Sequence, residues 1–331
     1  MKQAGVSRRM LIGIAGAAAI GGTAMMAWPA LAQTRPRYLL ATGAAGGSFH
    51  EYGPVFAEIV GRRASIDLDI HATAGSNDNI RALAAAEADL GLVSLGPAYG
   101  AWNGLGRFAA DGPQRGLRAL FPMYEAPLAL LALPGKGIGN LSDLRGRKVG
   151  VGPAGGPADI VFKGLAKALG IEARAVTGAP GDLARKLEAG HLDALWSGSP
   201  LPVAAFADVL EKTGGVILGL GGDELAALRA AFPFFTPAAI PAATYRGQSA
   251  AVATASVWNF GLCTDRLPDD VAYALTRAAL GDAKELAAFV PAAARTKAAD
   301  AAANTFLTFH PGAARYYREA GVAIPAALAP G

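Results

Sequence analysis

The chain has 331 residues, of which 52% are apolar and 17% are charged, so it is long enough for two ordinary domains or one large one. This composition is too hydrophobic for a disordered chain and too poor in charge for a coiled coil. Without Lys2, Arg8 and Arg9, the 27 remaining basic residues nearly balance the 26 acidic ones, which leaves a net charge of +1. That balance argues against nucleic acid as the main partner, because phosphate binding needs a clustered basic face.

The first 32 residues have the pattern of an export signal. A short basic start precedes 19 uncharged residues from Met10 to Trp28, and Ala30-Leu31-Ala32 then satisfies the small-x-small rule of signal peptidase. We therefore expect cleavage before Gln33 and a periplasmic mature protein. A transmembrane anchor is the alternative, since 19 uncharged residues can cross a bilayer, but glycines and alanines dilute the run.

The export route and the lone cysteine bear on the compartment. Ser7-Arg8-Arg9-Met10-Leu11-Ile12 resembles the twin-arginine motif, and the general secretory route is the alternative. Outside the cytoplasm, the single Cys263 has no intramolecular partner, which excludes a disulfide framework. We expect it to be a small buried apolar residue.

The mature chain alternates between strand and helix patterns. In chain order, we expect a strand at 38–42, a glycine-rich loop at 43–48, a helix at 52–60, a strand at 68–73, a helix at 77–86, a strand at 89–95, and strands at 119–124 and 127–133. After 134–137 the pattern restarts with a strand at 148–151, a helix at 157–169, a strand at 173–177, a helix at 183–189 and a strand at 192–196. A strand at 256–262 precedes a mainly helical tail after 269. Such alternation predicts parallel sheets with helices on both faces.

A short sequence pattern occurs in both halves of the chain, as a weak internal repeat. In each half a helix ends at Glu-Ala, an aspartate opens a strand, and the strand ends on a serine, Ser94 in the first half and Ser197 in the second. Open α/β sheets bind ligands beyond the carboxyl ends of their strands, so the two serines are predicted to line one cleft from opposite sides. The alternative is that any βαβ unit produces such a repeat by chance.

The loops after the expected strands are rich in backbone donors. The run Thr42 to Phe49 contains glycines that let the main chain approach a ligand, and Ser48 adds a hydroxyl. Ser76 and Asn77 open the next helix, where they serve either as helix caps or beside a bound carboxylate. Arg81, one turn later, is a candidate fixed charge or a solvated surface residue.

The second half contains Gly150-Val151-Gly152-Pro153-Ala154-Gly155, formally a dinucleotide-binding G-x-G-x-x-G with Glu172 as a ribose partner. Pro153 removes one amide donor, and Pro157 is better placed as the first residue of a helix. The same loop can hold a carboxylate. We therefore expect no cofactor, with NAD or NADP binding as the alternative.

Enzyme and metal signatures are not found. The sequence has no G-x-S-x-G, and His50-Glu51 lacks the second histidine of H-E-x-x-H. His50, His71, His191 and His310 show no metal-ligand spacing with each other or with Cys263. We expect a protein that is not an enzyme and holds no metal.

Several blocks in chain order carry a family resemblance. They are Ala41-Thr42-Gly43, Gly46-Gly47-Ser48-Phe49, Gly75-Ser76-x-x-Asn79, Glu87-Ala88-Asp89-Leu90-Gly91-Leu92-Val93, Leu144-Arg145-Gly146-Arg147-Lys148-Val149-Gly150-Val151-Gly152-Pro153, Tyr245-Arg246-Gly247-Gln248 and Leu267-Pro268-Asp269-Asp270-Val271-Ala272-Tyr273-Ala274-Leu275-Thr276. Together they resemble the TAXI-type solute receptors of tripartite ATP-independent periplasmic (TRAP) transporters. The resemblance implies a type II periplasmic-binding-protein fold, with two α/β lobes, a hinge crossed by two chain segments and a ligand cleft between the lobes. It also implies capture of a small organic acid or an amino acid such as glutamate, and delivery to a TRAP membrane permease.

Two departures from the family pattern fall at the expected pocket. Family members usually carry Thr-Tyr-Tyr-Pro after the first glycine loop, where this chain has Ser48-Phe49-His50-Glu51-Tyr52-Gly53-Pro54. Where Gly-Ser-Gly-Thr is usual in the second lobe, this chain has Gly155-Gly156-Pro157-Ala158. Both differences bear on which solute the pocket holds.

The resulting hypothesis is a receptor that captures its solute by closure of two lobes. We expect the export signal at 1–32, the first lobe at 33–134, the second lobe at 135–245, and a return to the first lobe with C-terminal helices at 246–331. The expected ligand-binding residues are Thr42, Gly47, Ser48, Phe49, Ser76, Asn77, Ser94, Gly155, Gly156, Trp196 and Ser197. Amides and hydroxyls would bind a carboxylate, and Phe49 and Trp196 would pack on the carbon chain, although Trp196 equally fits the lobe core. The alternatives are an exported NAD(P)-dependent oxidoreductase and a solute-sensing subunit of a signalling system.

Overall fold

A computed structural model describes residues 35–45, 47–281 and 283–330. The predicted export signal, with its cleavage site before Gln33, lies outside the described residues, as does Gly46 of the first glycine loop. None of the described helices is long and apolar enough to span a bilayer.

The first lobe is built on three parallel strands, each followed by a helix. Its strands are β1 (Arg37–Ala41), β2 (Asp67–His71) and β3 (Leu90–Ser94), in the order β2-β1-β3. Its helices are α1 (Ser48–Ala64), α2 (Ser76–Ala84) and α3 (Leu95–Asn103). Helix α1 begins four residues before the predicted start, and α3 was not predicted. Each helix starts just past the carboxyl end of a strand.

The second lobe repeats this plan. Its parallel strands are β5 (Lys148–Gly150), β6 (Arg174–Val176) and β7 (Ala194–Gly198), in the order β7-β5-β6. Its helices are α4 (Pro157–Ala168), α5 (Pro180–Glu188), α6 (Ala204–Thr213) and α7 (Gly222–Ala231). Here α6, α7 and two short strands were absent from the prediction.

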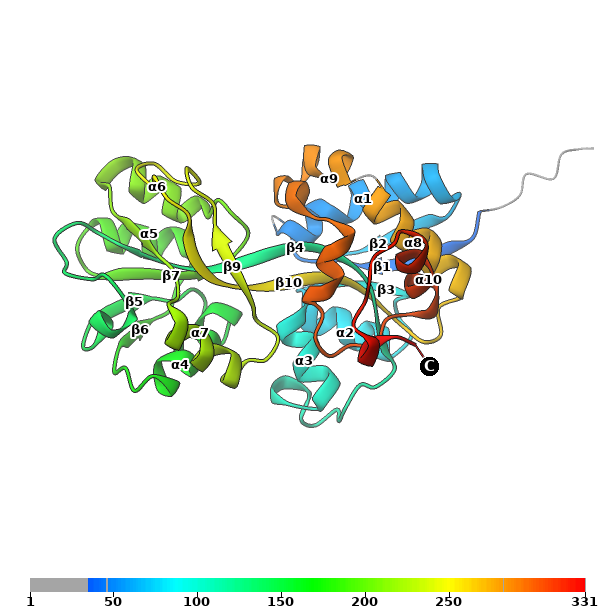
Figure 1. The fold of residues 1–331 in the computed structure, drawn as a ribbon, viewed down its shortest axis with the longest axis horizontal. Helices are drawn as coiled ribbons and strands as arrows, with labels where there is room; N and C mark the ends of the chain where they lie inside the picture. Colours follow the sequence, from blue (N-terminus) through cyan, green and yellow to red (C-terminus); the bar gives the residue numbers. More distant parts are fainter. Residues whose placement is uncertain (1–34, 46, 282, 331) are drawn as a thin grey trace, which may run out of the picture. The chain divides into compact units, whose positions relative to one another are not determined.

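Two long antiparallel strands belong to both lobes (Figure 1). They are β4 (Leu117–Ala132) and β10 (Val252–Thr264), and the full order is β2-β1-β3-β10-β4-β7-β5-β6. β8 (Val216–Leu218) pairs with β4, and β9 (Thr236–Ile240) pairs with β10. The two strands predicted at 119–124 and 127–133 are one continuous strand. The prediction of purely parallel sheets was wrong for these four strands, since each pairs antiparallel to its neighbours.

The helical tail predicted after residue 269 is confirmed, and it contacts the first lobe. It contains α8 (Asp269–Gly281), α9 (Ala283–Phe289), α10 (Pro311–Glu319) and short 3-10 turns at Pro291–Arg295, Ala298–Ala303 and Ala326–Leu328. α8 packs on α1 and α10, and Phe309 forms a β-bridge with Ala119 of β4. The chain thus leaves the first lobe through β4 and returns to it through β10.

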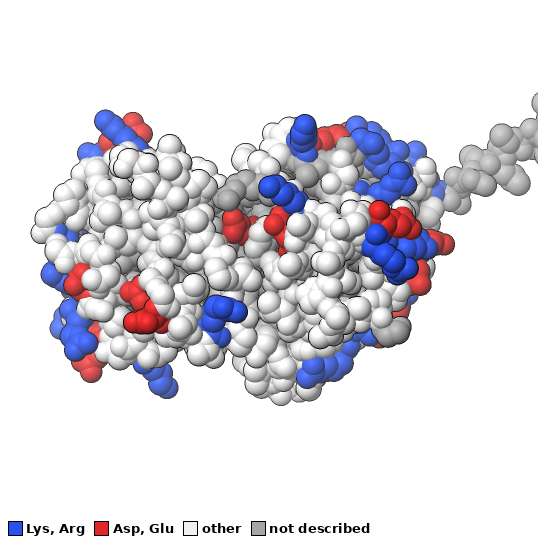
Figure 2. All heavy atoms as spheres, in the orientation of Figure 1, with Lys and Arg blue, Asp and Glu red and all other residues white. Residues whose placement is uncertain are grey.

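Apolar side chains of helices and strands meet in each lobe. In the first lobe, fully buried Phe56 of α1 lies 5.0 Å from the ring of Phe121 in β4. Cys263 is buried there too, as expected. On the face shown in Figure 2, acidic and basic side chains are interspersed and much of the surface is uncharged.

Candidate functional site

Helix starts gather at the carboxyl ends of the parallel strands in both lobes. The residues that precede α1, α2, α3, α4 and α5 are Gly47, Gly75, Ser94, Gly156 and Ala179, and none of them makes a side-chain capping hydrogen bond. By contrast, α10 is capped by the side chain of His310. First-turn amides without a side-chain cap are available to an anion, which the helix dipole also favours.

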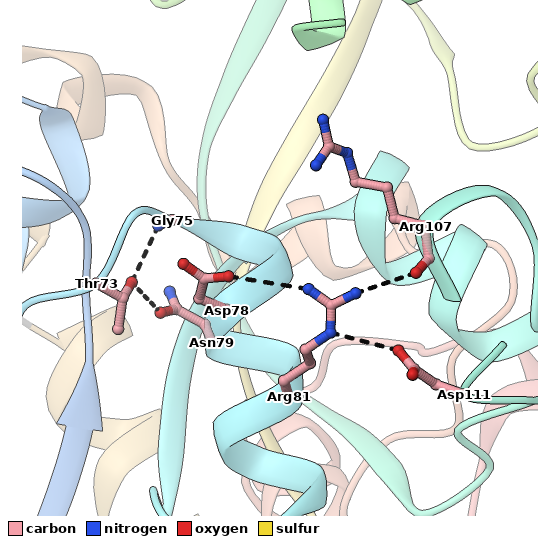
Figure 3. A network of polar contacts seen from close by, with 7 residues as sticks. All are labelled: Thr73, Gly75, Asp78, Asn79, Arg81, Arg107 and Asp111. Atoms are coloured by element: carbon pink, nitrogen blue, oxygen red, sulfur yellow. Dashed lines mark hydrogen bonds and ion pairs between the residues drawn. The ribbon is translucent and has the colours of Figure 1, made fainter. Parts of the chain in front are cut away.

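A buried polar side chain holds the first-lobe loops together. Asn79 of α2 is fully buried, and its amide nitrogen donates to the carbonyls of Thr42 and Leu92 at 2.6 and 2.7 Å. The hydroxyl of Thr73 donates to Asn79 Oδ1 at 2.6 Å and accepts from the amide of Gly75 at 3.0 Å (Figure 3). Thr42, a predicted site residue, is itself fully buried and donates to the His71 carbonyl at 3.2 Å. These bonds position the start of α2 against the ends of β1 and β3.

Two of the predicted serines are brought together. The amide of Ser94, at the end of β3, donates to Ser76 Oγ at 3.1 Å, which places the starts of α2 and α3 side by side. Asn77 follows Ser76 and is half-buried. Ser76 therefore serves the neighbouring helix start while its own hydroxyl proton remains available to a solute.

A tyrosine that the sequence analysis missed organises the start of α1. Tyr124 of β4 donates its hydroxyl to Ser48 Oγ at 2.7 Å, and its ring lies 6.4 Å from that of the predicted residue Phe49. Burial raises the pKa of Tyr124 well above its ordinary value, so the hydroxyl stays protonated and remains a donor. Gly47, which precedes α1, is exposed beside this pair.

A pocket of about 50 Å³ adjoins Tyr124 where β4 and β10 pass between the lobes. Its walls also include Glu125, Pro127 and Trp258 from the shared strands, Leu201 of the second lobe, and Pro291, Ala292 and Thr296 of the tail. Glu125 and Trp258 are paired in register across β4 and β10. Sequence reasoning missed all of these residues, because only the pairing of distant strands brings them together.

In the second lobe, the glycine-rich loop ends at an acidic side chain. Gly155 is exposed and has φ +68°, and its amide donates to Asp159 Oδ2 at 2.9 Å. Asp159 is only 3% exposed and pairs with Lys163 at 2.7 Å. Burial alone would raise the pKa of Asp159, but the bonds from Lys163 and the Gly155 amide hold it below the ordinary value. The loop therefore already has a carboxylate at the start of α4, next to Gly156.

The other two predicted residues of the second lobe lie on β7. Trp196 is 3% exposed and packs 5.7 Å from Phe162 of α4, so its ring belongs to the core. The hydroxyl of Ser197 donates to that of Ser199 at 3.2 Å. A hydrogen bond thus joins Ser76 to Ser94 in the first lobe, whereas the candidates of the second lobe are divided between the start of α4 and the end of β7.

Other predicted groups lie elsewhere in the structure. His50 stands in the first turn of α1. Arg81 of α2 pairs with Asp111 at 3.3 Å and donates to the carbonyl of Arg107 at 3.0 Å, which gives it a structural role (Figure 3). In the part of the chain that the structure describes, no group of three or more His, Cys, Asp or Glu side chains is arranged to hold a metal ion.

Comparison with known proteins places this geometry in a family. The model of the NMT1-like family matches residues 40–321. Among solved structures, a TctC solute binding protein from Polaromonas is similar at 15% identity and a TM-score of 0.51, covering 80% of this chain and 89% of its own. A putative periplasmic sulfonate-binding protein SsuA from Methylobacillus flagellatus is 15% identical, with a TM-score of 0.49 over 77% of this chain and 70% of its own. Malate-bound MatC from Rhodopseudomonas palustris is also 15% identical, with a TM-score of 0.47 over 78% and 88%. The chain belongs to the NMT1-like family, and it has the two-lobed α/β fold of periplasmic solute-binding proteins.

Proposed function

We propose that this protein is an exported solute receptor that captures a small organic anion or an amino acid between its two lobes. The observation that carries this proposal is that the starts of α1, α2 and α3 in the first lobe and of α4 and α5 in the second have no side-chain cap. Their amides offer a preformed site for a carboxylate. The likeness to a TctC solute binding protein supports the same use of the fold.

The residues around these helix starts supply the rest of the site. The hydroxyls of Ser48, Ser76 and Ser197 orient the solute, and Phe49 and Trp258 offer apolar surface to its carbon chain. Glu125, which lines the pocket near Tyr124, offers an acceptor to the ammonium group of an amino acid. The site thus accommodates a carboxylate alone or a carboxylate with an amine.

Capture depends on both lobes touching the same solute. A solute shifts the equilibrium between open and closed arrangements only by its higher affinity for the closed one. β4 and β10 are shared by the lobes, so a change in their twist near Pro127 and Ser256, which pair with each other, moves one lobe against the other. Pro127 lacks an amide proton, which weakens the ladder at this point.

For the wider system, we propose a receptor of TAXI type that delivers its solute to a TRAP membrane permease. The sequence blocks of that family support this assignment. A neighbouring gene for a large multi-span membrane protein is expected. A neighbouring histidine kinase in its place would favour the sensor alternative.

The oxidoreductase alternative is weaker on chemical grounds. A pyrophosphate at the G-x-G-x-x-G loop would need the Gly155 amide, which Asp159 already holds, and it would approach a buried carboxylate. Pro153 also offers no amide. Nucleotide absorbance in purified protein, or stabilisation by NADP, would favour this alternative.

The proposed function is tested by thermal shift and tryptophan fluorescence against organic acids and amino acids. We expect saturable stabilisation by at least one acid and a fluorescence change, because Trp258 lines the pocket. Ser76→Ala should weaken binding, and Ser142→Ala, an exposed serine of the second lobe, is the matched control. If no organic acid or amino acid stabilises the wild-type protein or changes its fluorescence, the proposal is overturned.

A further inference from the structure

A cation without a partner in the described part of the chain lies at the edge of the first lobe. Arg107 lies in a short 3-10 turn, Gly106–Phe108, that follows α3. Its main chain is clamped, because its carbonyl accepts from Arg81, which is held in turn by Asp111 and Asp78. The clamp fixes the position from which the Arg107 side chain extends.

The Arg107 side chain takes no part in that network. Figure 3 shows it turned away from Asp78 and Asp111. Among the residues that the structure describes, no hydrogen bond or ion pair reaches its guanidinium, whereas Arg81 and Arg118 of the same lobe pair with aspartates at 3.3 Å. Arg107 thus presents a positive charge without a counter-charge from the described residues.

This guanidinium lies against the second lobe. A Cβ placed on Gly155 would be 3.7 Å from Arg107 Nη2, so the arginine approaches the loop that precedes α4. Asp159, in the first turn of α4, is 3% exposed and already holds Lys163 and the Gly155 amide. Arg107 is exposed, so water solvates its guanidinium in the absence of a solute, and the charge is available to an anion.

We propose that Arg107 is a specificity-determining residue that binds an anionic group of the solute beside Gly155. The proposal rests on the proposed function and deepens it. Because the helix starts serve one carboxylate and Arg107 serves a second anionic group, the preferred solutes carry two such groups. The planar guanidinium also suits bidentate binding of a carboxylate, which a lysine cannot reproduce.

The test is calorimetric titration of the full mature chain with matched acids near neutral pH. The pairs are succinate with butyrate, glutarate with pentanoate, and aspartate with 2-aminobutyrate. Arg107→Gln should lower the affinity for the two-carboxylate member by about tenfold or more and leave its partner within about twofold. The affinity of Arg107→Lys for the two-carboxylate member should lie between those of the wild type and Arg107→Gln. Arg145→Gln, which removes an exposed arginine of the second lobe, is the control for loss of charge.

The outcomes separate this inference from the proposed function. A wild-type protein that binds none of the six acids would overturn both. Binding by the wild type with no preference for two carboxylates, or with an unchanged preference in Arg107→Gln, would overturn only the role of Arg107. If Arg107→Gln lowered the affinity for both acids of a pair equally, the role of Arg107 would also be overturned. Arg107 would then stabilise the contact between the lobes and would not bind the solute.

Discussion

The side-chain amide of Asn79 donates to the main-chain carbonyl of Thr42 at 2.6 Å and ties helix α2 to the end of strand β1. The same amide reaches the carbonyl of Leu92 in β3 at 2.7 Å. Asn79 is fully buried, so neither carbonyl has water as a substitute partner. One side chain thus sets the spacing of three elements at the proposed solute site.

Replacing Asn79 by alanine should be strongly destabilising. The Leu92 carbonyl would lose this donor, the Thr42 carbonyl would keep only the Thr73 hydroxyl, and that hydroxyl would lose Asn79 as an acceptor. Each lost bond of a buried group costs about 1–3 kcal/mol, so we expect the free energy of unfolding to fall by about 3 kcal/mol. Chemical denaturation measures this change. Asn103→Ala, which removes a half-buried amide that donates to Tyr99 at 3.0 Å, is the control and should cost about 1 kcal/mol. If the free energy of unfolding fell equally in the two variants, Asn79 would not be the residue that holds α2 against β1 and β3.

A steric relationship constrains the neighbouring helix. A Cβ on Gly53 of α1 would lie 2.5 Å from Thr42 Cγ2, which is too close for two carbon atoms. Alanine normally favours a helix interior over glycine by about 1 kcal/mol, yet here we expect Gly53→Ala to destabilise the protein by about 1–3 kcal/mol. Thermal or chemical denaturation shows whether Gly53→Ala raises or lowers the stability.

The companion variant Thr42→Ser removes only the clashing methyl group and keeps the hydroxyl that donates to His71. We expect the double variant to be more stable than Gly53→Ala alone, with a coupling energy of about 1 kcal/mol or more. Additive losses would show that the contact is not the cause.

The fold was predictable from the sequence where the signal is local. The parallel strands and the helices α1, α2, α4 and α5 follow from apolar runs bounded by glycine and proline. Helix α3 escaped prediction because Gly96, Pro97 and Gly100 suggest a loop. In the structure Pro97 stands in the first turn, where its missing amide proton costs nothing.

The site was predictable only in part, for a physical reason. Ser76 stands out because it opens a predicted helix and Ser94 because it ends a predicted strand, and the structure joins them. Tyr124 lies 76 positions from its partner Ser48 and in the middle of the apolar strand β4, so no local pattern marks it. Glu125 meets Trp258 only through the pairing of β4 with β10, which the sequence pattern does not specify.

The Tyr124–Ser48 bond links the hinge strand β4 to the start of α1, and its loss should affect both stability and binding. Tyr124→Phe leaves the ring and removes the hydroxyl, so we expect the free energy of unfolding to fall by about 1 kcal/mol. Solute affinity should fall several-fold, because Ser48 loses the donor that orients it. Tyr38→Phe, on β1, is the control and should leave affinity unchanged. Unaltered affinity in Tyr124→Phe would contradict a site at the start of α1.

Stability should depend on pH through His310, which is 1% exposed and caps α10 by accepting the Gly312 amide at 3.2 Å. Burial lowers the pKa of His310 below its ordinary value of 6.5, and this outweighs the opposing effects of the Leu267 main chain and Asp269. As pH falls below about 6.5, the unfolded chain gains a proton that the folded chain resists. The free energy of unfolding should therefore fall across that range.

His310→Asn replaces the capping Nδ1 with a side-chain oxygen that does not titrate in this range, so this variant should lose less stability on acidification. Denaturation curves on either side of pH 6.5 measure the difference. His191→Gln, at an exposed position, is the control and should lose as much stability on acidification as the wild type. The same acid loss in His310→Asn as in the wild type would exclude His310 as its source.

The most direct measurement is a crystal structure of the protein with a bound acid drawn from the binding panels. We expect the bound acid to be chemically unaltered, with its carboxylate oxygens about 3 Å from first-turn amides of helices in both lobes. An acid held by one lobe alone, one bound away from the helix starts, or one chemically altered would contradict the proposed function.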